Sequence, residues 1–295
     1  MRRTVRMKNQ MTAMTNAPKI QSALKGLILL GIMICFNPVS ALSADDPWEI
    51  SVGAGAYTAN VYYGADEYYV VPFPHAKATY TRGRFSASAS LLDGIGAMYM
   101  DTDSRFFGSI NINGGEERDP EEYNALGMAK DHSDDIKRLL EGSPAVKTSV
   151  RTEIMAGYLS RLGNFGISLE YHPTTVEGDT DRSYDGFVAG LSYCKPFQVT
   201  EKLVVTGMLG LSVMDQDYAE AWFSVEAPTQ RLEAFDAEAG LRDLHVVLQI
   251  DYMVSPRIGI TLLNGNCLLL KDAGESPYTQ SKYQMTSAVY GFYTF

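Results

Sequence analysis

Apolar and polar residues alternate along most of the chain after residue 45. In one segment, Phe85, Ala87 and Ala89 alternate with three serines. Successive side chains of a β-strand point to opposite faces, so such a segment predicts a strand with one apolar and one polar face. The segments with this period of two are 84–91, 106–113, 164–171, 187–193, 203–213 and 244–252. The chain is therefore predicted to be all-β.

Two architectures produce this pattern. A sandwich buries the apolar faces against one another, whereas a membrane barrel turns them outward to lipid. The strand-like segments are long enough to cross a bilayer when tilted. Aromatic residues gather at segment ends, as in interfacial girdles; they include Tyr62, Tyr63, Tyr68, Tyr69, Tyr290, Phe292 and Tyr293. These features favour a transmembrane antiparallel up-and-down β-barrel of the outer membrane, with about twelve strands and ten as the alternative.

The chain ends on an alternating segment, 283–295, whose last residue is Phe295. This ending resembles the C-terminal signal by which outer-membrane barrels are recognised for insertion. The resemblance implies that Phe295 is read by the barrel-insertion machinery, and that outer-membrane lipid surrounds the folded protein.

The first 44 residues have the composition of a secretory signal peptide. Six basic residues come before any acidic one, an apolar run covers 26–36, and small residues follow it. The run is shorter than the roughly 18–20 residues of a spanning helix. We therefore expect 1–44 to be cleaved between Ala41 and Asp45, and 45–295 to form the barrel domain in the outer membrane of a Gram-negative bacterium.

Two regions interrupt the alternation. The region 114–144 is polar and charged, with a short helix predicted over 134–141, and is expected to be a long loop or a plug-like insertion. A second irregular region, 226–241, is expected to connect later strands.

Charge excludes one class of partner. The predicted leader holds six of the 25 basic residues and none of the 35 acidic ones, so the rest of the chain carries a formal charge of −16. Nucleic-acid binding needs a surplus of Lys and Arg at the phosphates, so we expect no nucleic-acid partner.

Catalytic and metal-binding spacings are missing from the sequence. The four histidines, His75, His132, His172 and His245, have neither a close serine partner nor metal-ligand spacing. We therefore predict no enzyme activity, no cofactor and no metal. Cys194 and Cys267 lie 73 residues apart, and either free thiols or a disulfide is compatible with an exported protein.

The polar strand faces carry charges that would line the barrel interior. These are Arg151, Glu153, Glu170, Lys202, Asp251 and Arg257. They can pair across strands and fill a narrow lumen, or set the selectivity of a solute pathway. The methionines at alternating positions, Met98, Met100, Met208 and Met214, are expected to face lipid.

Four blocks of the sequence resemble the MltA-interacting protein family (MipA/OmpV). They are 55–74, 217–227, 235–243 and 271–277, and a fifth match surrounds Arg118 and Leu126. The positions that carry the resemblance are Tyr63, Gly64, Asp66, Pro72, Tyr218, Phe223, Gly240, Asp272, Ser276 and Pro277. Lys271 and Ser224 replace glycines of the family pattern, so the chain is similar to a divergent member. At these positions a tight-turn role and a binding role both remain open, and the turn role is favoured.

The resemblance implies an outer-membrane barrel that works as a scaffold. The family's namesake is thought to bridge a lytic transglycosylase and a peptidoglycan synthase, while other members are described as porin-like. The sequence thus suggests a scaffold that links murein-remodelling enzymes to the outer membrane; a narrow channel for small solutes is the alternative.

Overall fold

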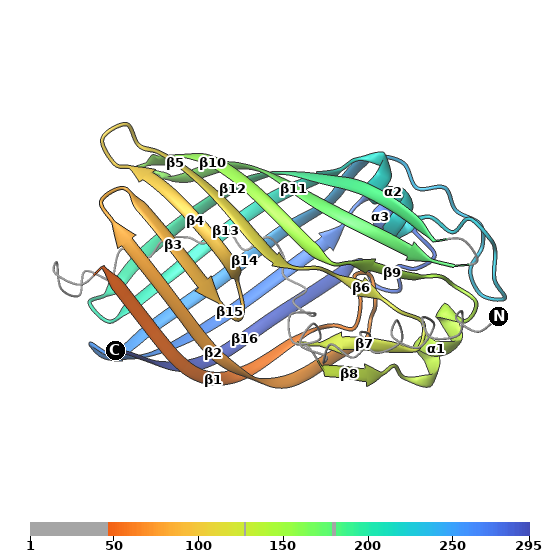
Figure 1. The fold of residues 1–295 in the computed structure, drawn as a ribbon, viewed down its shortest axis with the longest axis horizontal. Helices are drawn as coiled ribbons and strands as arrows, with labels where there is room; N and C mark the ends of the chain where they lie inside the picture. Colours follow the sequence, from red (N-terminus) through yellow and green to blue (C-terminus); the bar gives the residue numbers. More distant parts are fainter. Residues whose placement is uncertain (1–46, 127, 179–180) are drawn as a thin grey trace, which may run out of the picture.

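Twelve long strands close into one antiparallel barrel (Figure 1). The computed structural model describes residues 47–126, 128–178 and 181–295, so the predicted signal peptide lies outside the described residues. The barrel strands are β1 (Trp48–Asn60), β2 (Tyr68–Arg82), β3 (Phe85–Ser90), β4 (Gly94–Asp101), β5 (Phe106–Gly114), β10 (Val150–Ser160), β11 (Gly163–Glu177), β12 (Arg182–Thr200), β13 (Leu203–Met214), β14 (Gly240–Ser255), β15 (Ile258–Leu269) and β16 (Tyr283–Thr294).

Each barrel strand pairs with its neighbours in sequence, and two pairings close the circle. One joins β5 to β10 across the insertion, so that β10 lies between β5 and β11. The other joins β1 to β16, for example Ser51 to Thr294. The predicted all-β, up-and-down barrel and the expected count of about twelve strands are confirmed.

The outer face of the barrel is apolar, as the alternation predicts. Val70 is 70% exposed and Ile95 is 62% exposed, and Ile154, Ile167 and Leu191 on other strands are 57–60% exposed. The inner face carries buried polar side chains, among them Ser51, His75, Asn113, Arg151, Glu170, Thr206, Asp243, Thr261 and Gln284. In a sandwich a second sheet would cover this apolar face, whereas in a membrane barrel lipid covers it.

The four methionines do not face lipid. Ile95 and Tyr99 are on the outer face of β4, so Met98 and Met100 between and beside them point inward. Met208 and Met214 alternate with the outward Leu209 and are almost fully buried. The expectation for these residues was therefore wrong. Their long, flexible side chains fill irregular space inside the barrel.

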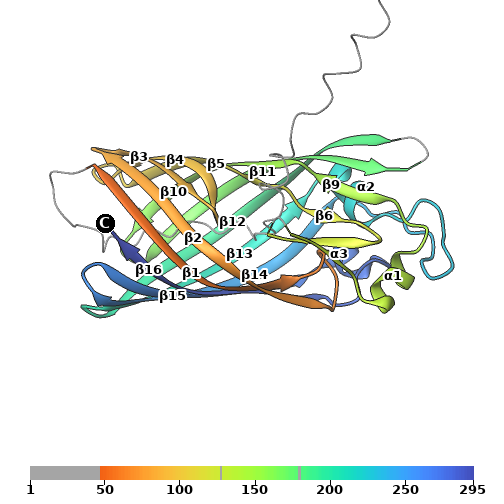
Figure 2. The ribbon, with the colours of Figure 1, turned by 60° about the horizontal axis from the view of Figure 1, so that its bottom comes forward.

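The two ends of the barrel differ. One end, here called the turn end, holds the start of β1, the end of β16 and five tight turns: 83–84, 102–105, 161–162, 201–202 and 256–257. The other, here called the loop end, holds the long connections 61–67, 115–149, 215–239 and 270–282 and the three helices of the described residues (Figures 1 and 2). No helix in the described ranges has the length and apolar composition needed to cross a bilayer.

The remaining elements lie at the loop end. They are β6 (Glu117–Arg118), β7 (Glu122–Ala125), β8 (Met128–Asp131), α1 (Asp134–Leu140), β9 (Ala145–Thr148), α2 (Gln216–Phe223) and α3 (Lys271–Glu275). The insertion 115–149 holds the first five. Its helix α1 is the one expected near 134–141, with Ser133 as its N-cap: the Ser133 hydroxyl accepts a hydrogen bond from the Ile136 amide.

Candidate functional site

Buried aromatic side chains gather at the loop end of the barrel. They belong to α2 and the connections around it. The segments 61–67, 216–239 and 270–282, which include α2 and α3, are here called the cap. Tyr218, Trp222, Phe223 and Tyr278 are at most 2% exposed. α2 starts at Asp215, whose carboxylate accepts a hydrogen bond from the Tyr218 amide at 2.9 Å. The helix then lies so close to β12 that a Cβ on Gly186 would meet Tyr218 at 2.9 Å.

Asp243 is the centre of one buried polar network. Its carboxylate is 2.6 Å from Arg242 Nε and 2.8 Å from His245 Nδ1. Tyr63, in the β1–β2 connection, donates its hydroxyl to Asp243 Oδ2 at 3.2 Å. Burial, followed by the negative charge of Asp243, raises the pKa of Tyr63 well above its ordinary value, so this phenol remains a donor. The same hydroxyl is 3.4 Å from the sulfur of Cys267, a free thiol, so Cys267 is not in a disulfide.

Arg151 is the centre of a second network. Its guanidinium is 3.7 Å from both Glu116, in the insertion, and Glu170, on the neighbouring strand β11. Glu170 in turn contacts His172 Nε2 at 3.1 Å. All four residues are at most 8% exposed. Two residues expected to line the interior, Arg151 and Glu170, thus form an ion pair across two strands.

Cap residues connect the two networks. The Tyr218 hydroxyl accepts a hydrogen bond from Arg242 at 3.4 Å, and its ring packs against His172 with centroids 5.0 Å apart. Arg118 of the insertion donates to the Trp222 carbonyl, and its guanidinium lies 3.5 Å from the Tyr278 ring centroid. The barrel wall, the insertion and the cap therefore share one buried polar assembly.

Several positions singled out by the family resemblance meet in this cap. The Gly64 amide donates to Gln284 Oε1, and its carbonyl accepts from the amides of Gln280 and Ser281. Ser276 Oγ donates to the Phe223 carbonyl at 2.7 Å. These contacts join segments that lie far apart in sequence.

Asp272 makes the next such contact, because its carboxylate accepts the Glu238 amide at 2.8 Å. Pro277 lies half-buried between Ser276 and the fully buried Tyr278. The blocks at 55–74, 217–227, 235–243 and 271–277 thus come together at the loop end, and their polar positions hold cap segments together.

Three singled-out positions stay outside the assembly. Asp66 is exposed. Gly240 begins β14 in open space, and nothing in the structure explains the glycine. Pro72 lies on the part of β2 that no described strand pairs with on the side away from β1, since β3 covers only Lys77–Arg82. A proline at such an edge costs no ladder hydrogen bond.

The other expected interior charges are dispersed. Glu153 is buried directly opposite Glu170 in the β10–β11 register. Asp251 accepts hydrogen bonds from Thr261 and Gln249, far from the cap. Arg257 is exposed in a tight turn, and so is Lys202; neither lines the interior. Turn residues escape the strand alternation, so the pattern misplaced these two.

Sequence reasoning missed Asp243 with His245 and Glu170 with His172 as partners. In both pairs the residues are two apart on one strand, so the period of two places them on the same face. That signal was available. Glu116 and Arg118 carried no signal, because the insertion does not alternate.

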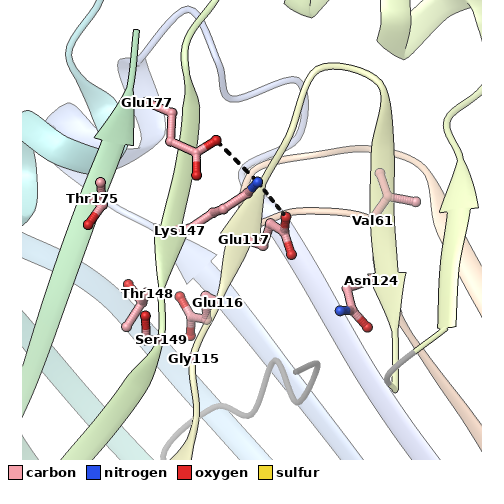
Figure 3. A pocket seen from close by; sticks show the side chains of 10 residues that line it. All are labelled: Val61, Gly115, Glu116, Glu117, Asn124, Lys147, Thr148, Ser149, Thr175 and Glu177. Atoms are coloured by element: carbon pink, nitrogen blue, oxygen red, sulfur yellow. Dashed lines mark hydrogen bonds and ion pairs between the residues drawn. The ribbon is translucent and has the colours of Figure 1, made fainter. Parts of the chain in front are cut away.

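A small polar cavity lies where the insertion meets the wall (Figure 3). It has a volume of about 210 Å³ and lies between β7 on one side and β6, β9 and β11 on the other. The Lys147 ammonium forms ion pairs with Glu117, Asp119 and Glu177 at 3.2–3.6 Å. The lysine therefore balances part of the negative charge of these carboxylates. Within the described residues, no group of three or more His, Cys, Asp or Glu side chains could hold a metal ion.

A closed barrel with an apolar exterior, a polar interior and short turns at one end defines an outer-membrane β-barrel protein. At its loop end, Tyr63 and Tyr218 of the cap form hydrogen bonds with the buried Arg242–Asp243 ion pair of the barrel wall. A family model described as MltA-interacting protein MipA matches residues 52–295. The chain belongs to this family, as the resemblance of its sequence blocks indicated.

Comparison with curated proteins gives no match. Among solved structures, the fold is similar to OmpT of Vibrio cholerae, with 7% identity over 86% of this chain and 99% of that chain and a TM-score of 0.34. It is also similar to the NanC porin, with 9% identity, 82% and 98% coverage and a TM-score of 0.42. The translocator domain of the autotransporter NalP from Neisseria meningitidis gives 9% identity, 86% and 90% coverage and a TM-score of 0.41.

Proposed function

We propose that this protein is an outer-membrane anchor that binds a lytic transglycosylase of the MltA type and so links murein-remodelling enzymes to the membrane. The observation that carries the proposal is the family match over 52–295, because the family's description states an interaction with MltA. A peptidoglycan synthase is the second partner that the scaffold role implies.

The packing of the loop end supports a binding role over a transport role. Buried charged side chains at this end form ion pairs, Arg151 with Glu170 and Arg242 with Asp243. Trp222 and Tyr278 of the cap are also buried. A pathway for solutes would need these groups to be hydrated and the cap to move.

The turn end is the surface that we assign to the partner. In bacterial barrels short turns face the periplasm and long loops face outward. Murein and its lytic enzymes lie on the periplasmic side, so the partner would meet the tight turns and not the cap.

Site-specific photocrosslinking tests this assignment. A photoreactive amino acid is placed at Ser104, exposed in the 102–105 turn, and in a matched variant at Gln230, exposed at the loop end. The barrel, in lipid nanodiscs, is mixed with a purified MltA-type transglycosylase. We expect a crosslink from position 104 and none from position 230. No crosslink from either position, with no binding by interferometry, would overturn the proposal.

Planar-bilayer conductance distinguishes the scaffold function from the alternative, a narrow channel for small solutes. A barrel held shut by the cap should give no steady current. Steady, ion-selective current from the purified protein, together with no transglycosylase binding, would favour the channel function instead.

A further inference from the structure

Every tight turn at the turn end presents a basic side chain. The five residues are Arg82, the last residue of β2 beside the turn 83–84, and Arg105, Arg161, Lys202 and Arg257 within the other four turns, and all five are exposed. None of them forms an ion pair with a described acidic residue; Arg84, beside the first, already pairs with Asp101 and Asp103. Here these five residues are called the basic ring.

The basic ring contrasts with the charge of the rest of the molecule. The region 114–144 at the loop end contains nine acidic and four basic residues. At the opposite rim, residues 82–84, 102–105, 161–162, 201–202 and 256–257 contain six basic and two acidic residues, so the positive surplus there is a local feature and not a result of overall composition.

Two members of the ring, Arg257 and Arg82, point toward the outside of the barrel. Arg257 Nη1 donates to the hydroxyl of Tyr293, an outward residue of β16, at 3.2 Å. Lys202 Nζ reaches the backbone carbonyl of Val254, on β14, at 3.5 Å, so its ammonium lies along the rim. Arg82 shares the outward face of β2 with Val70 by alternation.

The ring lies next to an aromatic girdle. Trp48 and Tyr80 pack with ring centroids 5.0 Å apart, and Phe106 packs on Tyr158 at 5.3 Å, all near the turns. Aromatic girdles mark the boundary between hydrocarbon and headgroups. The charges just beyond it are therefore at the height of the lipid phosphates.

A lysine within the girdle supports the same placement. Lys195 is on the outward face of β12, and its ammonium lies 5.2 Å from the centroid of the Phe197 ring, two residues nearer the turn. Lysines at membrane boundaries run their alkyl stem along apolar surface and keep the ammonium at the headgroups.

From these observations we infer that the basic ring binds the phosphates of anionic phospholipids in the leaflet at the turn end. Headgroup phosphates are the anions that a ring on the outer rim meets all around the barrel. An acidic protein would contact only part of such a ring. The inference does not depend on the proposed partner.

The test uses the mature barrel in nanodiscs that contain phosphatidylglycerol and phosphatidylcholine in equal amounts. Native mass spectrometry measures the ratio of the two lipids that remain bound to the protein after it is released from the nanodisc. The variant carries R82Q, R161Q and K202Q together. Its matched control carries K130Q, R231Q and K282Q, which remove the same charge from exposed positions at the loop end.

We expect the wild-type protein and the loop-end control to prefer phosphatidylglycerol. In the turn-end variant the ratio of bound phosphatidylglycerol to phosphatidylcholine should fall roughly fivefold for each basic side chain removed. Heat-modified migration on gels verifies that all three barrels are folded. An unchanged lipid ratio in the turn-end variant would overturn the inference, as would an equal loss in the control.

Transglycosylase binding by the same variants separates the two proposals. Lost lipid preference with retained transglycosylase binding supports the lipid ring whatever the outcome for the partner. Retained lipid preference with lost transglycosylase binding would show that the ring is a protein-docking surface and would overturn the inference.

Discussion

Asp243 holds together parts of the chain that are far apart in sequence. Its carboxylate contacts Arg242 and His245 on its own strand, Tyr63 from the first connection, and Ser212 on β13. A buried ion pair adds little net stability, but removing one partner leaves the other charge buried without compensation.

Asp243→Asn should therefore lower the free energy of unfolding by about 3–5 kcal/mol. Urea unfolding of the refolded barrel in vesicles, followed by tryptophan fluorescence, measures the change. Asp236→Asn, in the same region but exposed, is the control and should leave the midpoint in place. Equal midpoints for the two variants would mean that Asp243 does not hold the cap.

The backbone conformation of Gly64 leads to a second prediction for a single residue. Its φ of +112° is rarely adopted by other residues, and an added Cβ would lie 3.1 Å from Thr279 Oγ1. Gly64→Ala should cost about 1–3 kcal/mol of unfolding free energy. Gly207→Ala, on β13 with open space around it, is the matched control and should cost nothing. A loss of similar size in both variants would remove the argument from backbone conformation.

Single residues were the least predictable level of this structure. The period of two placed Arg151 and Glu170 on interior faces, because both lie within strands. It misplaced Arg257, since a turn residue follows no alternation. It gave no account of Tyr63 or Ser276, whose partners lie more than fifty residues away.

At the scale of elements, the strands were predictable and the cap helices were not. A strand with one face in lipid must alternate, so 84–91 and 164–171 lie where β3 and β11 form. α2 and α3 have eight and five residues, which is too short for a helical period to show in the sequence. Their positions are set by tertiary packing against the wall.

The insertion is attached to the cap through an aromatic and polar seam. Tyr123 stacks on Tyr69 of β2 with centroids 5.3 Å apart, and Ser133 donates to Glu67. His132 is 5% exposed, contacts the Asp119 carbonyl at 2.9 Å through Nε2, and packs edge-on to Tyr62. A protonated imidazole would be poorly solvated in this seam.

Burial lowers the pKa of His132 below its ordinary value of 6.5, outweighing the bond to the Asp119 carbonyl, which raises it. The unfolded histidine takes up a proton near pH 6.5, whereas the docked one takes it up at lower pH. The contribution of His132 to docking is thus complete above about pH 6.5 and falls as the pH drops toward the folded pKa.

Protease cleavage of the insertion in intact vesicles should therefore accelerate between about pH 7 and about pH 5. The His132→Asn variant provides the control, because it removes the titrating group and should flatten this dependence. If the variant keeps the wild-type pH profile, another group controls docking.

At the scale of the whole molecule, the first and last strands close the barrel. The Phe295 amide donates to the Ile50 carbonyl at 3.0 Å, while Phe295 is 72% exposed and its ring packs edge-on with that of Tyr293. A backbone bond closes the end of the circle, and the side chain itself buries little. The structure thus gives the aromatic ring no large part in stability, which is compatible with a part in assembly.

Phe295→Ala should therefore slow assembly in cells and leave the folded barrel almost as stable as the wild type, within about 0.5 kcal/mol. Pulse-labelling with heat-modified migration on gels measures assembly in the membrane, and urea unfolding of the refolded protein measures stability. Phe85→Ala, an exposed phenylalanine at the same end, is the matched control and should assemble at the wild-type rate. If Phe295→Ala instead refolds poorly in detergent as well, the ring is needed for closure of the barrel, and recognition by the insertion machinery need not be invoked.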